Sequence, residues 1–217
     1  MSVELVHCTS DAEALIVRMA RVSNPSNADN RETAPRLLRY LVRHRHWSPF
    51  EMASMCVRIE TQRDVAAQLL RHRSFSFQEL SQRYAVVDPA EPPRFRRQDA
   101  TNRQNSTDDL DAEVQAWIAD RAALVMNNAY LAYEEMLGMG VARECARRVL
   151  PLCTPTTLYM HGTVRSWIHY LQVRLDAGTQ LEHREVAQGC LRVFAEAFPV
   201  IAEAVALGGE GGDDGGS

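Results

Sequence analysis

Apolar and polar residues follow two different periods along this chain. Short runs alternate or are continuously apolar, as in strands, while longer runs repeat their apolar residues at the spacing of a helix face. Breaks fall at Pro- and Asn-rich stretches such as residues 24–30 and 47–50. We predict strands over residues 2–8, 53–60 and 156–160, and helices over residues 10–21, 34–46, 62–71, 111–137, 141–149, 163–175 and 182–205.

These elements indicate a helix-rich α+β fold, a single domain with a small antiparallel sheet. The strands are too few and too far apart for a doubly wound sheet. We expect one domain over residues 1–207 and a flexible Gly/Asp-rich tail over 208–217. Residues 88–109 are rich in Pro, Arg and Asn, and we expect a surface segment there that covers a site.

Composition narrows the class of protein. With 217 residues and 46% hydrophobic content, the chain can bury one core. It has no apolar run long enough for a membrane span and no leader-like start, so we expect a cytoplasmic protein without membrane contact. All 24 basic residues are arginine, yet the net charge of -4 argues against a general polyanion-binding protein. The five cysteines form no CxxC pair, and we expect no metal.

Residues 71–84 concentrate the candidate chemistry. Their sequence, RHRSFSFQELSQRY, brings together three arginines, a histidine, a carboxylate and three serines. Arginine forks bind phosphate oxygens in pairs, Ser81 can donate to a phosphate, and Glu79 can accept from a ribose hydroxyl or orient an arginine. Because the chain has no GxGxxG or GxxxxGK[ST] loop, side chains must hold any nucleotide.

The order of these residues, RHRxxSxxxxSxR from Arg71 to Arg83, closely resembles the signature of flavin-dependent thymidylate synthases. Residues 46–51 (HWSPFE) resemble a second segment of that family, and residues 20–23 its early loop. Residues 142–151 and 165–174 resemble two later segments, in the same order. The resemblance covers about two-thirds of the chain. It implies the family fold and the reductive methylation of dUMP to dTMP, with methylenetetrahydrofolate as carbon donor and NADPH-reduced FAD as hydride source.

The resemblance also implies roles for individual residues. Arg174 would be catalytic, and His46 would line the flavin or folate pocket. The residues implied for dUMP are Gln68, Arg71, Glu79, Leu80, Ser81, Gln82, Arg83, Arg147 and Arg174. The residues implied for FAD are Ser23, Ser48, Glu51, Arg71, His72, Arg73, Glu79, Thr163, Arg165 and His169. As in the family, the sites would lie between the subunits of a homotetramer. Four positions depart from the family pattern: Met52, Gln78, Thr163 and Gly178.

Other interpretations of the same residues remain open. The arginine cluster is also consistent with an exposed basic loop, or, with Phe75, Phe77, Tyr84 and Phe95 interleaved, with a nucleic-acid-binding module. We expect no nucleic-acid partner, because the net charge is negative. The residue types are also consistent with a flavin enzyme that acts on a different pyrimidine nucleotide. Cys153, after a proline, is a candidate nucleophile like that of the classical thymidylate synthases, or a small core residue. His44 and His46 would need further ligands to bind a metal.

Overall fold

The computed structural model describes residues 1–208, so the expected tail lies outside the described residues from residue 209 onward. Its elements, in chain order, are β1 (Ser2–Cys8), α1 (Ala12–Ala20), η1 (Pro25–Asn27), α2 (Ala34–Arg43), η2 (Ser48–Met52), β2 (Ser54–Gln62), α3 (Arg63–Leu69), β3 (Ser76–Glu79), β4 (Arg97–Gln98), β5 (Ser106–Thr107), α4 (Ala112–Gly138), α5 (Arg143–Ala146), η3 (Arg147–Val149), β6 (Pro155–Thr163), α6 (Val164–Arg174), α7 (Leu181–Ala197) and α8 (Pro199–Gly208). The α, β and η labels mark α-helices, strands and 3-10 helices.

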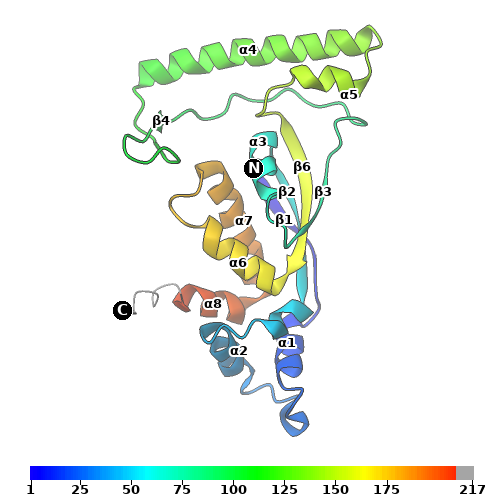
Figure 1. Ribbon diagram of the computed structural model, residues 1–217, viewed down its shortest axis with the longest axis vertical. Helices are drawn as coiled ribbons and strands as arrows, with labels where there is room; N and C mark the ends of the chain where they lie inside the picture. The colour runs from blue at the N-terminus through cyan, green and yellow to red at the C-terminus, as the bar shows by residue number, and fades with distance from the viewer. Residues whose placement is uncertain (209–217) are drawn as a thin grey trace.

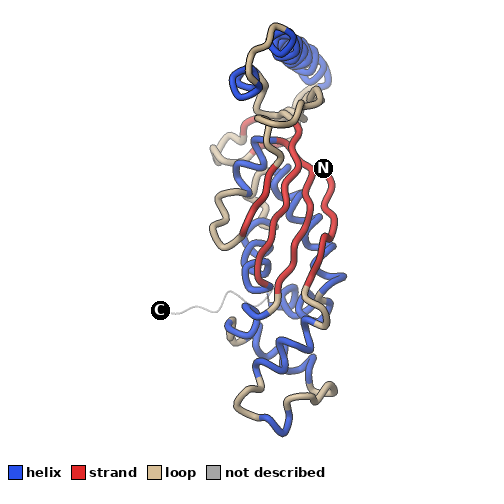
Figure 2. The backbone as a smooth tube through the Cα atoms, turned by 90° about the vertical axis from the view of Figure 1, so that its right-hand side faces the viewer, coloured by secondary structure: helices blue, strands red, loops and turns tan. Residues whose placement is uncertain are grey.

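Four strands form the central sheet in the order β1-β2-β6-β3, and all of its pairs are antiparallel. Figure 2 shows these strands side by side with helices behind them. Alternate residues of β2, such as Met55, Val57 and Ile59, are fully buried beneath those helices. On the opposite face Arg58 pairs with Glu4 and Glu60. The alternation therefore gives the sheet one apolar and one polar face.

The helices α3, α6 and α7 supply most of the core on the buried face. Trp167 and Tyr170 of α6 are fully buried, and the Trp167 indole donates to the carbonyl of Met55 at 3.0 Å. Farther along the long axis of the molecule, α1, α2 and α8 pack around η2 and the end of the sheet (Figure 1). This arrangement confirms the helix-rich α+β prediction. None of the helices within residues 1–208 combines the length and apolarity needed to cross a bilayer.

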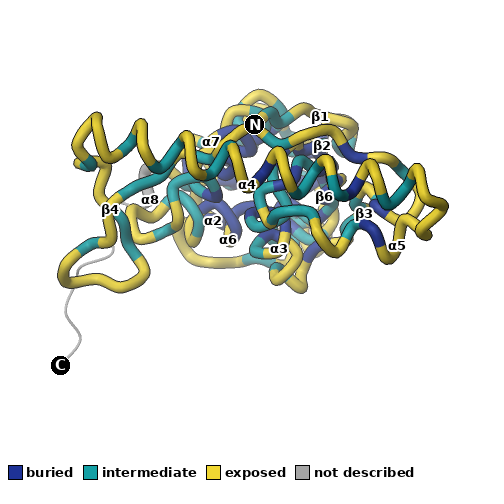
Figure 3. The backbone as a smooth tube through the Cα atoms, turned by 90° about the horizontal axis from the view of Figure 1, so that it is seen from above, coloured by how far each residue is buried: buried dark blue, intermediate teal, exposed yellow. Residues whose placement is uncertain are grey.

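Helix α4 lies apart from this core. It runs for 27 residues along the outside of the molecule, and Figures 1 and 3 show it above the end of the sheet with most of its length exposed. Only Met126 and Tyr133 of its residues are buried. Its large apolar side chains at Trp117, Val125 and Leu131 are all more than half exposed. An apolar surface of this extent is typical of a helix that packs against another subunit.

Several predicted boundaries were wrong, each for a local reason. The helix expected over 182–205 is two helices, because Pro199 excludes helical geometry at Phe198, whose φ is -137°. The helix expected over 141–149 shrinks to α5 and η3 before Pro151. Helix α2 ends at Arg43 rather than residue 46, and Arg45 takes a positive φ of 55°. The sequence pattern also missed β3 and the hairpin of β4 and β5.

A close contact between Phe75 and Gly162 fixes the segment before β3. The Phe75 ring lies directly over the bare backbone of Gly162 in β6, where an added Cβ would come within 2.5 Å of the ring. Phe75 also packs edge-on against Trp167, with ring centroids 4.8 Å apart. Glycine at residue 162 is therefore required by close approach of the aromatic ring.

The substitution Gly162→Ala is expected to lower the free energy of unfolding by about 1–3 kcal/mol, because the added methyl group must displace a packed ring. Urea unfolding followed by circular dichroism measures the change. Gly138→Ala is the control, since nothing lies within 4 Å of a Cβ there. That helical position should instead gain about 0.5–1 kcal/mol. Equal stability of the Gly162→Ala variant and the wild type would contradict the proposed packing constraint.

Candidate active site

The first part of the signature forms a tight reversal, the arginine turn, over residues 70–75 between α3 and β3. Phe75 holds the turn on the sheet, while Arg71 and Arg73 are exposed. His72 faces α6, where its Nε2 accepts a hydrogen bond of 2.8 Å from Nε of Arg174. Since that nitrogen is the acceptor, the neutral His72 ring carries its proton on Nδ1. The predicted catalytic arginine and the central signature histidine therefore touch.

A cavity of about 660 Å³ opens beside this contact, and we call it the arginine cavity. Two guanidinium groups, four carboxamides, a hydroxyl and one carboxylate provide its polar side chains: Arg71, Arg174, Gln68, Asn102, Gln104, Gln180, Thr179 and Asp176. Guanidinium forks bind phosphate, and carboxamides both donate and accept, as the edge of a pyrimidine does. The lining therefore suits a phosphorylated pyrimidine.

The cations at this cavity are available to a ligand. Among residues 1–208, no carboxylate lies within 4.0 Å of the guanidinium groups of Arg71 or Arg174, the two arginines that line it. Burial, together with the charge of Arg174, lowers the pKa of His72 to about 4. The same two causes lower the pKa of the fully buried His183 to about 3. Both histidines are neutral near pH 7, so the arginines carry the positive charge.

A polar band connects the arginine turn to the other end of α6. Arg165 donates to Glu51 Oε1 at 2.6 Å, Thr163 donates to Glu51 Oε2 at 2.9 Å, and the Arg165 bond lowers the pKa of Glu51. Ser166 donates to the carbonyl of Ser74 in the arginine turn at 3.3 Å. The band thus joins three predicted FAD residues, Glu51, Thr163 and Arg165, to the arginine turn. Because α6 rises about 1.5 Å per residue, Arg165 and Arg174 are about 14 Å apart along its axis.

The remaining FAD candidates lie at different distances from this band. His169 is one turn beyond Arg165, is exposed, and lies close enough to His72 to lower its pKa. Ser48 is exposed at the start of η2. Ser23 lies farther off, in a pocket between α1 and α2. His46 is exposed beside Tyr40, with ring centroids 5.8 Å apart.

The predicted dUMP residues separate into two groups. Gln68, Arg71 and Arg174 line the arginine cavity. Residues 80–83 instead follow β3 toward α5, where Arg83 pairs with Glu144 at 3.1 Å and Arg147 begins η3. Glu79 lies between the groups and accepts from Arg63 and Thr156, both at 2.9 Å. A single chain therefore does not bring the whole predicted set into one cavity.

The segment expected to cover a site reaches the arginine cavity. Residues 88–109 pass beneath α4 and form the β4–β5 hairpin, whose loop places Asn102 and Gln104 on the cavity wall (Figure 1). Arg96 anchors the segment to α7 through both oxygens of Glu182, and the second of these bonds is 2.9 Å long. The segment therefore contributes two carboxamides to the cavity wall, and its covering role stays a prediction.

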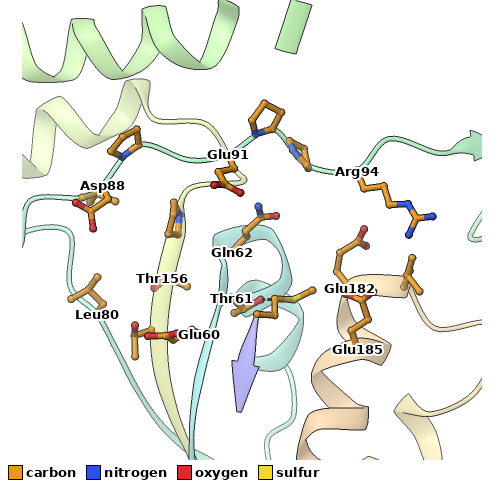
Figure 4. Close-up of a pocket in the computed structure, with 18 of the residues that line it drawn as sticks. Glu60, Thr61, Gln62, Leu80, Asp88, Glu91, Arg94, Thr156, Glu182 and Glu185 are labelled. Atoms are coloured by element: carbon orange, nitrogen blue, oxygen red, sulfur yellow. Dashed lines mark hydrogen bonds between the residues drawn. The ribbon is translucent and has the colours of Figure 1, made fainter. Parts of the chain in front are cut away.

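A second cavity, of about 580 Å³, has the opposite character. It lies between residues 86–94, the top of the sheet and the start of α7 (Figure 4). Five carboxylates line it: Glu60, Asp88, Glu91, Glu182 and Glu185. Leu80, a predicted dUMP residue, also lines it. The one arginine in the lining, Arg94, is paired with Asp108, so the cavity is net acidic and repels a phosphate group. The arginine cavity is the better candidate for an anionic ligand.

Two of the four departures from the family pattern have structural roles. Thr163 caps α6 by accepting from the Ser166 amide at 3.3 Å, besides its bond to Glu51. Gly178 lines the arginine cavity, and its amide donates to Asp176. Met52 and Gln78 are exposed, at the end of η2 and on β3.

Sequence reasoning missed several polar residues at this site: Asp176, Thr179, Gln180, Asn102, Gln104 and His183. Asp176, Thr179 and Gln180 lie within six residues of Arg174, and that proximity was an available signal. Asn102 and Gln104 are far away in sequence, and only the hairpin brings them to the cavity. His183 occupies an apolar position of α7, and the sequence pattern alone does not distinguish it from a core residue.

The structure weakens the rival interpretations of the arginine-rich stretch. Of the four interleaved aromatic residues, Phe75 is buried in the core and Phe77 and Phe95 are partly buried, which leaves Tyr84, 79% exposed, as the one open ring among them. Arg94, Arg96 and Arg97 are paired with Asp108, Glu182 and Asp109.

In the part of the chain that the structure describes, no three acidic, histidine or cysteine side chains gather as a metal site would require.

The chain thus combines an α+β fold with a cavity whose arginine and amide side chains suit a phosphorylated ligand. The sequence pattern of the thymidylate synthase complementing protein family matches residues 4–200. The chain is 49% identical to a probable flavin-dependent thymidylate synthase of Paramecium bursaria Chlorella virus 1, over 93% of this chain and 94% of that protein. It is also 49% identical to the flavin-dependent thymidylate synthase of Synechocystis sp., over 89% of each chain.

A solved structure agrees with these relatives. The UMP/dUMP methylase PolB from Streptomyces cacaoi, bound with 5-Br dUMP, superposes with a TM-score of 0.84 at 30% identity, over 95% of this chain and 94% of that one. The chain belongs to the family of flavin-dependent thymidylate synthases.

The low pKa of His183 predicts how stability depends on pH. An unfolded histidine binds a proton near pH 6.5, whereas the folded one stays neutral until about pH 3. The stability that this residue contributes is therefore complete above pH 6.5 and is lost as the pH falls below it. Between pH 7 and pH 5, the free energy of unfolding should fall by about 2 kcal/mol more in the wild type than in a His183→Asn variant. Parallel urea titrations test this, and equal falls would contradict it.

Proposed function

We propose that this protein is a flavin-dependent thymidylate synthase, which methylates dUMP to dTMP with methylenetetrahydrofolate as carbon donor and NADPH-reduced FAD as hydride source. The arginine cavity is the observation that carries the proposal. It joins Arg71, Arg174 and Gln68, three residues predicted to bind dUMP, at one opening. The solved relative bound with 5-Br dUMP supports a pyrimidine nucleotide as the ligand.

The residues present fit FAD by their chemistry. The band from Glu51 through Arg165 and Ser166 to Arg73 and His72 offers hydroxyls and two exposed guanidinium groups, as a diphosphate and ribityl chain require. It ends at the arginine cavity, so a cofactor held along it would reach the substrate. FAD, when bound, supplies the hydride and electron chemistry.

Arg174 would activate the pyrimidine. Its Nε is held by His72, which leaves both Nη groups of the fork for the ligand. A guanidinium at the uracil edge stabilises the negative charge that develops as N3 loses its proton, and an electron-rich ring attacks the carbon donor more readily. Arginine suits this role because its charge is permanent. His72 fixes the angle of the fork, and Arg71 is free to hold the phosphate.

We further propose a homotetramer with active sites between subunits. The predicted dUMP residues form two groups in one chain, at the arginine cavity and near α5, and an interface would bring a group from each of two subunits together. The exposed apolar side chains of α4 supply a surface for that contact. Such a site would combine Arg71 and Arg174 of one subunit with Ser81, Arg83 and Arg147 of another.

The name of the solved relative favours one additional candidate function. That protein is described as a UMP/dUMP methylase, so methylation of UMP is a second possible reaction on the same site. Tritium release from 5-tritiated UMP, compared with release from 5-tritiated dUMP, distinguishes the two. Release from dUMP alone supports the thymidylate synthase.

The substitution Arg174→Ala is expected to reduce dTMP formation by at least 100-fold, because it removes a charge positioned at the reacting ring. FAD binding should persist, since Arg165, Arg73 and Glu51 remain. Tritium release from 5-tritiated dUMP measures the first effect, and the visible flavin spectrum the second. Arg18→Ala, at an exposed arginine of α1, is the matched control. Unchanged turnover in the Arg174→Ala variant would exclude a catalytic role for this residue.

The substitution Cys153→Ser is expected to leave turnover within about twofold of the wild type. Burial raises the pKa of this thiol, whose sulfur lies 3.8 Å from the sulfur of Met126, and a protonated thiol is a poor nucleophile. The same tritium-release assay checks the prediction. Loss of turnover with normal FAD and dUMP binding would revive the nucleophile interpretation.

A further inference from the structure

His183 in the first turn of α7 is a polar residue with no exposed surface, outside the set of predicted site residues. Its Nδ1 lies 3.2 Å from Oε1 of Gln68, which lines the arginine cavity. An amide oxygen can only accept, so Nδ1 carries the proton and donates. The other ring nitrogen, Nε2, is buried without a partner among the described residues. In this tautomer Nε2 is unprotonated, so no buried N–H group is left without an acceptor.

The hydrogen bond from His183 to Gln68 stands at one end of a series of hydrogen bonds. The carboxylate of Glu182, at the other end, fixes the direction of every bond in the series. Glu182, held by Arg96, accepts from Nε2 of Gln180 at 2.9 Å. A carboxylate cannot donate, so Gln180 must turn its oxygen toward Gln68, where it accepts from Nε2 at 2.6 Å. Gln68 must then turn its own oxygen toward His183. The orientation of every amide follows from Glu182.

This series of hydrogen bonds leaves Gln68 one amide hydrogen and one oxygen lone pair for a ligand. It also fixes which side of the carboxamide donates and which side accepts. A carboxamide without such partners can rotate and exchange its donor and acceptor. The pyrimidine edge carries adjacent donor and acceptor groups, so only one of the two orientations matches it. Orientation of Gln68 therefore bears directly on recognition of the base.

We propose that His183 is a positioning residue, which holds the Gln68 carboxamide in the orientation that recognises the pyrimidine ring of the substrate. The inference rests on the proposed function, since it takes dUMP as the ligand of the arginine cavity. His183 touches neither the substrate nor the flavin in this role. It acts through Gln68, and Glu182 and Gln180 set the direction from the opposite side.

The test compares three variants of the FAD-loaded full-length protein. In His183→Leu the donor is lost while most of the volume is kept. In His183→Asn the amide nitrogen can occupy the place of Nδ1, whereas in His183→Gln it lies one bond farther out. The dissociation constant for dUMP is measured by calorimetry, with kcat, KM and FAD affinity measured alongside.

We expect His183→Leu and His183→Gln to weaken dUMP binding about tenfold, the scale of one oriented hydrogen bond, and to raise KM in parallel. His183→Asn should stay within about threefold of the wild type. In all three variants kcat and FAD affinity should change less than twofold. If His183→Leu does not fold, the Asn and Gln variants still give the comparison, because both bury an amide at the same position.

A double-mutant cycle tests whether His183 acts through Gln68. In a Gln68→Ala background, His183→Leu should weaken dUMP binding no further, whereas additive losses would overturn the proposal. Equal dUMP affinity in His183→Leu and the wild type, or equal losses in the Asn and Gln variants, would also overturn it. These results would leave the proposed function standing if the wild type binds and methylates dUMP. A wild type that binds no dUMP would overturn both.

Discussion

The contact between Phe75 and the backbone of Gly162 is the constraint on which the candidate site depends. The arginine turn is polar and largely exposed, so it has little apolar surface of its own to hold it in place. Phe75 provides that hold by packing into the core between Gly162 and Trp167. With the turn fixed on the sheet, His72 faces α6 and meets Arg174. The signature therefore needs an aromatic residue and a distant glycine as much as its arginines.

Charge is divided sharply between the two cavities beside the sheet. The arginine cavity has two guanidinium groups that pair with no carboxylate of residues 1–208, whereas the cavity below residues 86–94 has five carboxylates (Figure 4). Residues 88–109 contribute to both, with acidic residues at one end and Asn102 and Gln104 at the other. The ion pair between Arg96 and Glu182 fixes this segment where the two cavities approach each other. An anionic ligand thus meets attraction in one cavity and repulsion in the other.

Local patterns predicted most of the fold and the part of the site that is contiguous in sequence. Alternation found β1, β2 and β6, and helical spacing found α1, α2, α4, α6 and α7, and most of these elements, though not the exposed β1 and α4, bury one face in the core. The strand β3 was missed because its four residues lie inside the signature, where polar chemistry hides the alternation. Asn102 and Gln104 could not be predicted, since a hairpin of two short strands places them at the cavity. Roles for Arg83 and Arg147 stay predictions, because one chain holds them away from Arg174.

The environment of the two histidines beside Arg174 explains why arginine suits this position better than lysine would. Burial and the neighbouring charge keep the pKa values of His72 and His183 at about 4 and about 3, so neither adds a second positive charge near pH 7. The same environment would lower the pKa of a lysine and weaken its charge, whereas a guanidinium remains protonated. His72 can therefore accept from Arg174 and orient it, while His183 donates to Gln68 on the other side. Neutral histidines thus direct hydrogen bonds around a cation whose charge does not depend on pH.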